Sequence, residues 1–256
     1  MATYKKRGTK PNDRKNQETL ESQSTTAEVF KTLDNTASQS EQWIEKNKKP
    51  LFYGLVIVIV LILGYMGYNK FVAEPNEKEA SNELAFPRKY FDEASNSAGA
   101  VADSLFRLGL EGADANYGFV DIADRYKSTK AGNLANYYAG MSYYKLKDYQ
   151  LAIEFLEKFN SSDDMLGPIA IGTIGDAFSD LNQSAEALDY YEKAANKRTN
   201  EFSTPLYLLK AGKTALELGE FARAESLFQR IKDEFATTDF SKGIDQYINS
   251  AKFAQQ

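Results

Sequence analysis

The feature that most constrains this chain is one uninterrupted apolar run, residues 51–68, which reads LFYGLVIVIVLILGYMGY. No charged residue interrupts these eighteen positions, and eleven of them are Leu, Ile, Val or Phe. A helix of this length rises about 27 Å, close to the hydrocarbon thickness of a bilayer, and its large apolar residues contribute on the order of −3 to −7 kcal/mol to insertion. The alternative, a buried strand or core helix, fits less well because strands are shorter. We therefore predict one transmembrane helix over residues 50–70.

The residues on either side of this run predict whether it is cleaved and how it is oriented in the membrane. Fifty residues precede it and no small-x-small cleavage site follows it closely, so a permanent anchor is favoured over a cleaved signal peptide. Lys46, Lys48 and Lys49 come directly before the run, whereas four glutamates follow within fifteen residues of its end. Because positive flanks stay in the cytoplasm, we expect a cytoplasmic N-terminus and residues 70–256 across the membrane. The basic N-terminal fifty residues and the acidic remainder agree with this orientation.

The cytoplasmic arm divides into two parts. Residues 1–24 are polar and basic and are predicted to be a disordered tail. Residues 25–49 carry apolar residues at helical spacing, including Trp43, and predict an amphipathic juxtamembrane segment. This segment can lie on the cytoplasmic leaflet or dock onto a membrane-embedded partner. Nucleic-acid binding is disfavoured, since the basic tip has only Tyr4 as an interleaved aromatic residue.

Two further observations bear on function. The chain has no Cys and no His, which removes thiol catalysis, the commonest general base and the commonest transition-metal ligand. We therefore expect no enzymatic activity, no cofactor and no metal site. Within the apolar run, Gly64 and Gly67 are small enough to admit a partner helix, or simply face lipid.

A repeated pattern of about 35 residues organises the rest of the chain. Residues 136–159, 171–194 and 208–231 superpose without gaps, and in each a glycine is followed twelve residues later by an alanine. These pairs are Gly140 with Ala152, Gly175 with Ala187, and Gly212 with Ala224. Small residues at both positions let two helices cross closely, so each unit is predicted to be a helical hairpin that stacks on its neighbours.

This small–small–aromatic pattern resembles the tetratricopeptide repeat family. The first helix of that family's repeat usually begins with Trp, whereas the positions here are Asn136, Ile171 and Leu208, so the version is divergent. The predicted fold is all-α: one N-terminal transmembrane helix followed by a tetratricopeptide-repeat α-solenoid over residues 75–256. Its expected parts are degenerate helices at 77–127, with a kink or break at Pro87, clear repeats at about 133–160, 168–196 and 205–233, and a capping helix at 241–254.

The resemblance implies a protein-binding groove on the first helices of the repeats. The positions that would line it are Tyr137, Met141, Tyr144, Asp176, Ser179, Leu209, Lys213 and Leu216. This set lacks the basic and Asn clamp that family members use for acidic tails, and favours hydrophobic peptide segments or a partner's helix. The alternative is that some of these residues pack against the helices of 77–127.

The whole arrangement resembles the YfgM-like family of ancillary subunits of the bacterial Sec translocon, in a form similar to that of Bacteroidota. The stretches TTAEVFKTLD, KAGNLANYYAGM and NEFSTPLYLLKAG carry this likeness. The resemblance implies a single-pass protein of the bacterial inner membrane with a periplasmic C-terminal domain. Its expected partners are a SecYEG-type translocon, a periplasmic membrane-anchored prolyl-isomerase-like chaperone, secreted client proteins and the lipid bilayer. Two alternatives are a scaffold of another cell-envelope assembly, division or secretion complex, and an import receptor on an organelle outer membrane.

Overall fold

The computed structural model describes residue 29 and residues 41–255, and the chain divides into two units between Tyr68 and Asn69. Helices and loops make up residues 41–255, with no strand among them. This confirms the prediction of an all-α chain.

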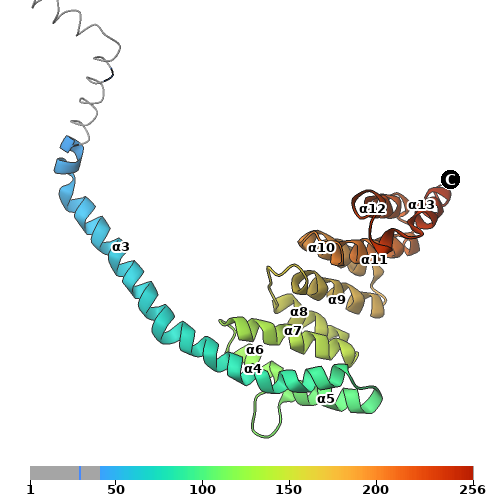
Figure 1. The fold of residues 1–256 in the computed structure, drawn as a ribbon, viewed down its shortest axis with the longest axis horizontal. Helices are drawn as coiled ribbons and strands as arrows, with labels where there is room; N and C mark the ends of the chain where they lie inside the picture. The colour runs from blue at the N-terminus through green and yellow to red at the C-terminus, as the bar shows by residue number, and fades with distance from the viewer. Residues whose placement is uncertain (1–28, 30–40, 256) are drawn as a thin grey trace, which may run out of the picture. The chain divides into compact units, whose positions relative to one another are not determined.

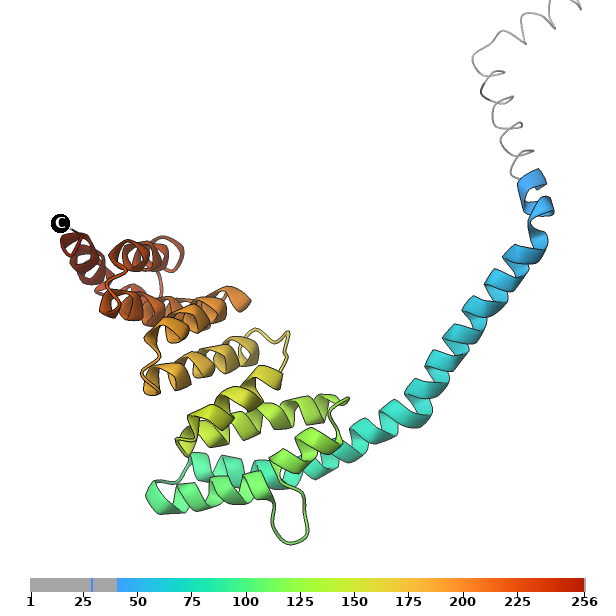
Figure 2. The ribbon, with the colours of Figure 1, turned by 180° about the vertical axis from the view of Figure 1, so that it is seen from behind.

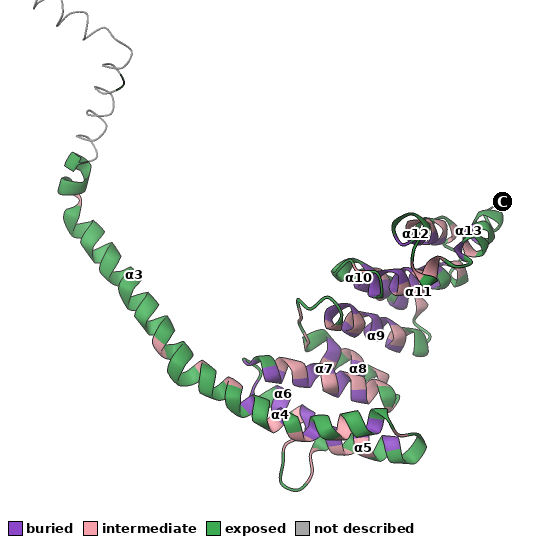
Figure 3. Cartoon of the chain, in the orientation of Figure 1, coloured by how far each residue is buried: buried purple, intermediate pink, exposed green. Residues whose placement is uncertain are grey.

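The first unit contains the predicted membrane segment. Residues 41–46 are helical, and α3 follows as Lys48–Tyr68. No residue of α3 is buried, and Figure 3 shows the helix exposed along its length. Among the described residues, this apolar stretch belongs to the one helix long and apolar enough to cross a membrane. The predicted tail at residues 1–24, and most of the juxtamembrane segment, lie outside the described residues.

The second unit begins with elements that precede the clear repeats. These are the π-helix η1 (Asn69–Ala73), α4 (Glu74–Ser95), α5 (Gly99–Glu111) and α6 (Phe119–Arg125). Of the kink or break expected at Pro87, the break is not observed, because α4 continues through this residue. The Pro87 ring is fully buried. This packing offsets the loss of the backbone hydrogen bond that proline cannot donate.

Three helical hairpins follow at the predicted repeats. Figures 1 and 2 show them stacked in chain order between α4–α6 and the C-terminus. Their helices are α7 (Lys130–Lys145) with α8 (Tyr149–Lys158), α9 (Leu166–Asp180) with α10 (Ser184–Lys197), and α11 (Ser203–Glu217) with α12 (Phe221–Glu234). The 3₁₀-helix η2 (Asp239–Ser241) and α13 (Ile244–Phe253) complete the domain.

The turn inside each hairpin has the same backbone conformation. Lys147, Asn182 and Gly219 adopt positive φ angles of 65°, 61° and 77°. In each case the next residue donates its N–H to a carbonyl five residues earlier, as Asp148 does to Tyr143 at 2.9 Å. This is the Schellman motif, which satisfies carbonyls at the end of the first helix and reverses the chain.

The glycine–alanine crossing explains how tightly the hairpins close. A Cβ atom placed on Gly140 would lie 2.5 Å from Cγ of Leu156, and one on Gly175 would lie 2.8 Å from the Tyr191 ring. The glycines are therefore required for the large side chains of the second helix to reach across. Ala152, Ala187 and Ala224 are all fully buried at the same crossings.

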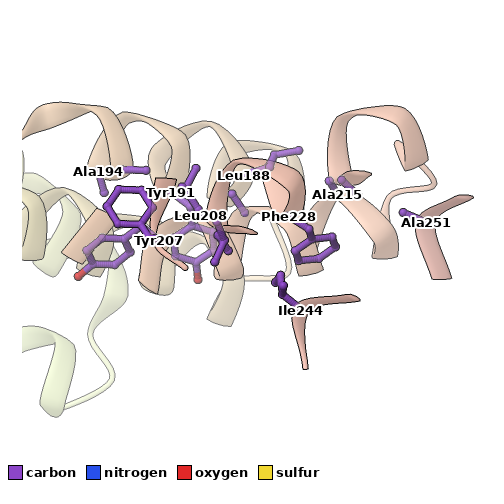
Figure 4. Close-up of a cluster of buried hydrophobic side chains, with 14 of the residues drawn as sticks. Leu188, Tyr191, Ala194, Tyr207, Leu208, Ala215, Phe228, Ile244 and Ala251 are labelled. Carbon is purple, nitrogen blue, oxygen red and sulfur yellow. The ribbon is translucent and has the colours of Figure 1, made fainter. Parts of the chain in front are cut away.

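The largest buried cluster joins the last two repeats and the final helix. Figure 4 shows Leu188, Tyr191, Tyr207, Leu208 and Phe228 meeting there. Ile244 and Ala251 of α13 belong to the same cluster, so this helix covers apolar surface that the last repeat would otherwise expose.

Candidate functional site

The predicted groove positions lie on α7, α9 and α11, and the structure divides them by depth. Tyr137 is buried, 9 % exposed, in a cluster with Leu156, Ala170 and Ile174, and its ring lies 5.1 Å from that of Phe159. Tyr137 therefore belongs to the core between the first two repeats rather than to an open surface.

Three other apolar members of the predicted set also contribute to packing. Met141 is partly buried against the cluster that contains Tyr137. Leu209 and Leu216 are partly buried against the cluster of the last repeats. The sequence left open that these residues pack against residues 77–127. In these clusters their neighbours come instead from the repeats and α13.

The remaining members are polar or amphipathic and reach the surface. Ser179 and Lys213 are exposed, and Lys213 Nζ lies 5.2 Å from the ring centre of Tyr247. Tyr144 and Asp176 are partly buried. The accessible part of this surface is therefore more polar than the sequence pattern predicts.

Two carboxylates of α9, one helical turn apart, organise this polar surface. Asp176 accepts a hydrogen bond from the Tyr191 hydroxyl at 2.7 Å and pairs with Lys210 Nζ at 2.7 Å. Asp180 accepts a hydrogen bond of 3.2 Å from the Tyr144 hydroxyl. We call Tyr144, Asp176, Asp180, Tyr191 and Lys210 the α9 cluster; it connects all three repeats.

The tyrosine hydroxyl groups of this cluster have raised pKa values. Burial, followed by the charges of Asp176 and Asp180, raises the pKa of Tyr144 above its ordinary value. Burial and then Asp176 raise the pKa of Tyr191 in the same direction. Because a neighbouring negative charge opposes formation of a phenolate, both tyrosines stay neutral near pH 7 and act as hydrogen-bond donors.

The sequence pattern did not identify Asp180 and Lys210 as functional candidates. The repeat alignment selects positions by the family's groove pattern, and neither residue lies on that list. A usable signal was the spacing of Asp176 and Asp180, which places both carboxylates on one face of a helix.

A hollow lies on a different part of the domain, between α6, α7 and α8. It has a volume of about 370 Å³ and is lined in part by Asn136 and Phe155. Asn136 stands where the other two repeats carry Ile171 and Leu208, and Leu208 is fully buried. Asn136 is itself buried, and its Nδ2 donates a hydrogen bond to the carbonyl oxygen of Gly132 at 3.2 Å.

The residues proposed for membrane docking are all accessible. A Cβ atom added to Gly64 or Gly67 would meet no atom within 4 Å. Trp43 is 59 % exposed. These positions leave room for a partner helix, and nothing in the described part of the chain occupies it.

Residues 41–255 contain no candidate metal site. No group of three or more Asp and Glu side chains there is arranged to hold an ion.

Comparison with known families agrees with the hairpin geometry. Residues 134–162 and 207–238 match one tetratricopeptide-repeat profile, and residues 170–196 match another. No curated protein matches the chain. Tetratricopeptide repeats generally form non-catalytic scaffolds for protein–protein interaction. The chain therefore contains three tetratricopeptide repeats, formed by α7–α8, α9–α10 and α11–α12, and these repeats indicate a protein-interaction scaffold.

Proposed function

We propose that this chain is a non-enzymatic, single-pass scaffold of the bacterial inner membrane, with its repeat domain in the periplasm. The observation that carries this proposal is the combination of α3, which exposes its apolar side chains along its length, with three protein-binding repeats on the same chain. An exposed helix of this composition is unfavourable in water and favourable in lipid.

The distribution of charge supports the proposed orientation. Lys46, Lys48 and Lys49 precede the span, while Glu74 and Glu77 follow shortly after it. Lysines near one end of a span hold that end in the cytoplasm, whereas glutamates have little effect on the orientation. This charge distribution supports the proposal that the repeats lie on the opposite side of the membrane.

The orientation can be measured in spheroplasts. Protease added outside intact spheroplasts should digest the repeat domain and leave an N-terminal epitope tag protected by the membrane. The matched control variant replaces Lys46, Lys48 and Lys49 by Gln and adds three lysines after Asn69; it should expose the tag more often. Protection of the repeat domain in the wild type would contradict the proposed orientation and favour a scaffold that faces the cytoplasm.

Within this class, we propose that the protein is an ancillary subunit of the Sec protein-translocation machinery. Its membrane helix would lie beside a SecYEG-type translocon, and its repeats would hold a membrane-anchored prolyl-isomerase-like chaperone or an emerging secreted protein. The support is the resemblance in architecture to the YfgM-like family, together with accessible glycines on α3 that let another helix approach.

Affinity purification in mild detergent tests the partner. The tagged wild type is compared with a variant carrying Gly64→Ile and Gly67→Ile, which keeps the span apolar but fills the space beside it. Translocon and chaperone components should be enriched with the wild type, and translocon recovery should fall with the variant. Recovery of a different envelope assembly, division or secretion complex would overturn the Sec assignment and leave the anchored-scaffold proposal intact.

A further inference from the structure

The α9 cluster holds one lysine of its own chain in a defined way. Both carboxylate oxygens of Asp176 lie close to Lys210 Nζ, at 2.7 and 2.8 Å. The same ammonium lies 5.5 Å from the ring centre of Tyr191 and 5.8 Å from that of Tyr207. Figure 4 shows these two rings next to one another, and their planes differ by 14°. A carboxylate and two tyrosine rings together therefore form a binding site for a cation.

A second set of the same three groups lies one turn further along α9. Asp180 accepts the hydroxyl hydrogen of Tyr144 at 3.2 Å. The Tyr144 ring centre lies 5.8 Å from that of Tyr149, with the planes tilted by 53°. Asp180 is exposed, and within residues 41–255 no lysine or arginine forms an ion pair with it. The set thus contains the same groups as the set around Lys210, with tilted instead of stacked rings and with its carboxylate exposed to solvent.

We propose that Asp180, Tyr144 and Tyr149 bind a lysine or arginine side chain of a partner protein segment. The site lies near the C-terminal ends of α7 and α9, with Tyr149 contributed by the start of α8. The inference rests on the proposed role of the repeats as a protein-binding scaffold, and it is independent of which partner is bound.

The charges around the site favour a basic side chain over an acidic or an apolar one. Burial and then the charge of Asp180 raise the pKa of Tyr149, and burial together with both α9 carboxylates raises that of Tyr144. Both phenols are therefore neutral at physiological pH, and the carboxylate is the charged group of the set. A partner carboxylate would be repelled, and an apolar side chain would leave the Asp180 charge without a partner. The acidic body of the chain, which carries 29 Asp and Glu against 21 Lys and Arg after residue 50, adds long-range attraction for basic segments.

The test uses the full-length protein in nanodiscs and a set of matched labelled peptides. The probe is a fluorescein-labelled ten-residue peptide of alanine, serine and leucine with one central variable residue. Lysine, arginine, norleucine and glutamate are compared at that position, and norleucine keeps the methylene chain of lysine without its charge. Fluorescence anisotropy measures the affinity of each peptide at low and high salt.

The expected order of affinity is lysine and arginine first, then norleucine, then glutamate. We expect the lysine peptide to bind about five- to tenfold more tightly than the norleucine peptide, with the difference shrinking in high salt. Asp180→Asn should abolish this preference, whereas Asp103→Asn on α5 removes an exposed carboxylate elsewhere and should leave it unchanged. Tyr144→Phe keeps the ring but not the hydroxyl hydrogen bond and should retain part of the preference. Thermal unfolding of each variant, followed by circular dichroism, confirms that it is folded.

Two contrary results are distinguishable. Peptides that bind equally well with lysine and norleucine would overturn the cation site while leaving the scaffold role in place. No binding by any peptide would overturn both the site and the proposed use of this surface for partner segments.

Discussion

Lys210 Nζ on α11 lies 2.7 Å from Oδ1 of Asp176 on α9, so a charged pair joins the second repeat to the third. The side chains of Lys210 and Asp176 are 35 % and 23 % exposed, which places the pair between a surface and a buried ion pair. Asp176 also accepts the Tyr191 hydroxyl hydrogen, so one carboxylate satisfies groups on two neighbouring helices. This contact adds a polar link between repeats that the buried apolar cluster already joins.

Asp176→Ala should lower the free energy of unfolding. The change leaves Lys210 without its carboxylate and the Tyr191 hydroxyl without its acceptor, at a cost of about 1–3 kcal/mol. Asp176→Asn keeps an acceptor for Tyr191 and should cost less. Urea unfolding followed by circular dichroism measures both, with the exposed Asp233→Asn as control. Equal stability of the alanine variant and the wild type would show that the pair contributes nothing.

Gly140→Ala should destabilise the first repeat, although the same change in an open helix is stabilising by about 0.5–1 kcal/mol. The added methyl group would lie 2.5 Å from Leu156 Cγ and 3.1 Å from the carbonyl oxygen of Ala152. Overpacking of this kind costs about 1–3 kcal/mol, so the net effect should be a loss. Gln150→Ala, at an exposed position of α8, is the control and should change stability little. A stabilised Gly140→Ala variant would mean that α7 and α8 cross less closely than described.

Asp163 should make the stability of α9 depend on pH in the acidic range. Backbone N–H groups of Leu166 and Met165 donate to its carboxylate at 2.8 Å, and these hydrogen bonds lower the pKa of Asp163. A carboxyl group whose pKa is lower in the folded state stabilises above its unfolded pKa, about 3.9, and this contribution disappears as pH falls through the lower folded value. The difference in melting temperature between wild type and Asp163→Ala should therefore be present at pH 7 and shrink below about pH 4. Asp163→Asn keeps the cap without the titration, so its stability relative to Asp163→Ala should not shrink there. A wild-type advantage over Asp163→Ala that kept its full pH 7 size throughout the acidic range would contradict this account.

Glu77 should anchor α4 to the first repeat. Its carboxylate accepts hydrogen bonds from the backbone N–H groups of Lys130 at 2.6 Å and Ala131 at 3.1 Å, which are free donors in the first turn of α7. Glu77→Ala should accelerate hydrogen exchange of these two amides and lower stability by about 1–2 kcal/mol. Asn82→Ala, at an exposed position of α4, is the control. Unchanged exchange at Lys130 and Ala131 would show that solvent or Thr129 already satisfies this helix start.

The sequence predicts the elements of this chain better than the contacts between them. The apolar run, the 35-residue period and the glycine–alanine spacing each depend on local order along the chain, and they identify α3 and the hairpins. The burial of Tyr137 depends on how far α9 covers α7, which the repeat register does not specify. The pairing of Asp176 with Lys210, 34 residues apart, depends on the rotation between repeats. Pro87 shows the opposite case: the local rule predicts a kink or a break, and α4 continues without a break through this residue, whose ring is buried.

The most direct test of the central claim is whether α3 holds the protein in a bilayer. Membranes from cells that express the chain are extracted with alkaline carbonate, and the pellet and supernatant are compared by immunoblot. A variant with Val58→Arg and Leu61→Arg is the control, since two arginines near the middle of the span cost about 5–7 kcal/mol of insertion free energy. The wild type should remain in the pellet and the variant should move toward the supernatant. Release of the wild type into the supernatant would contradict the membrane-anchored scaffold.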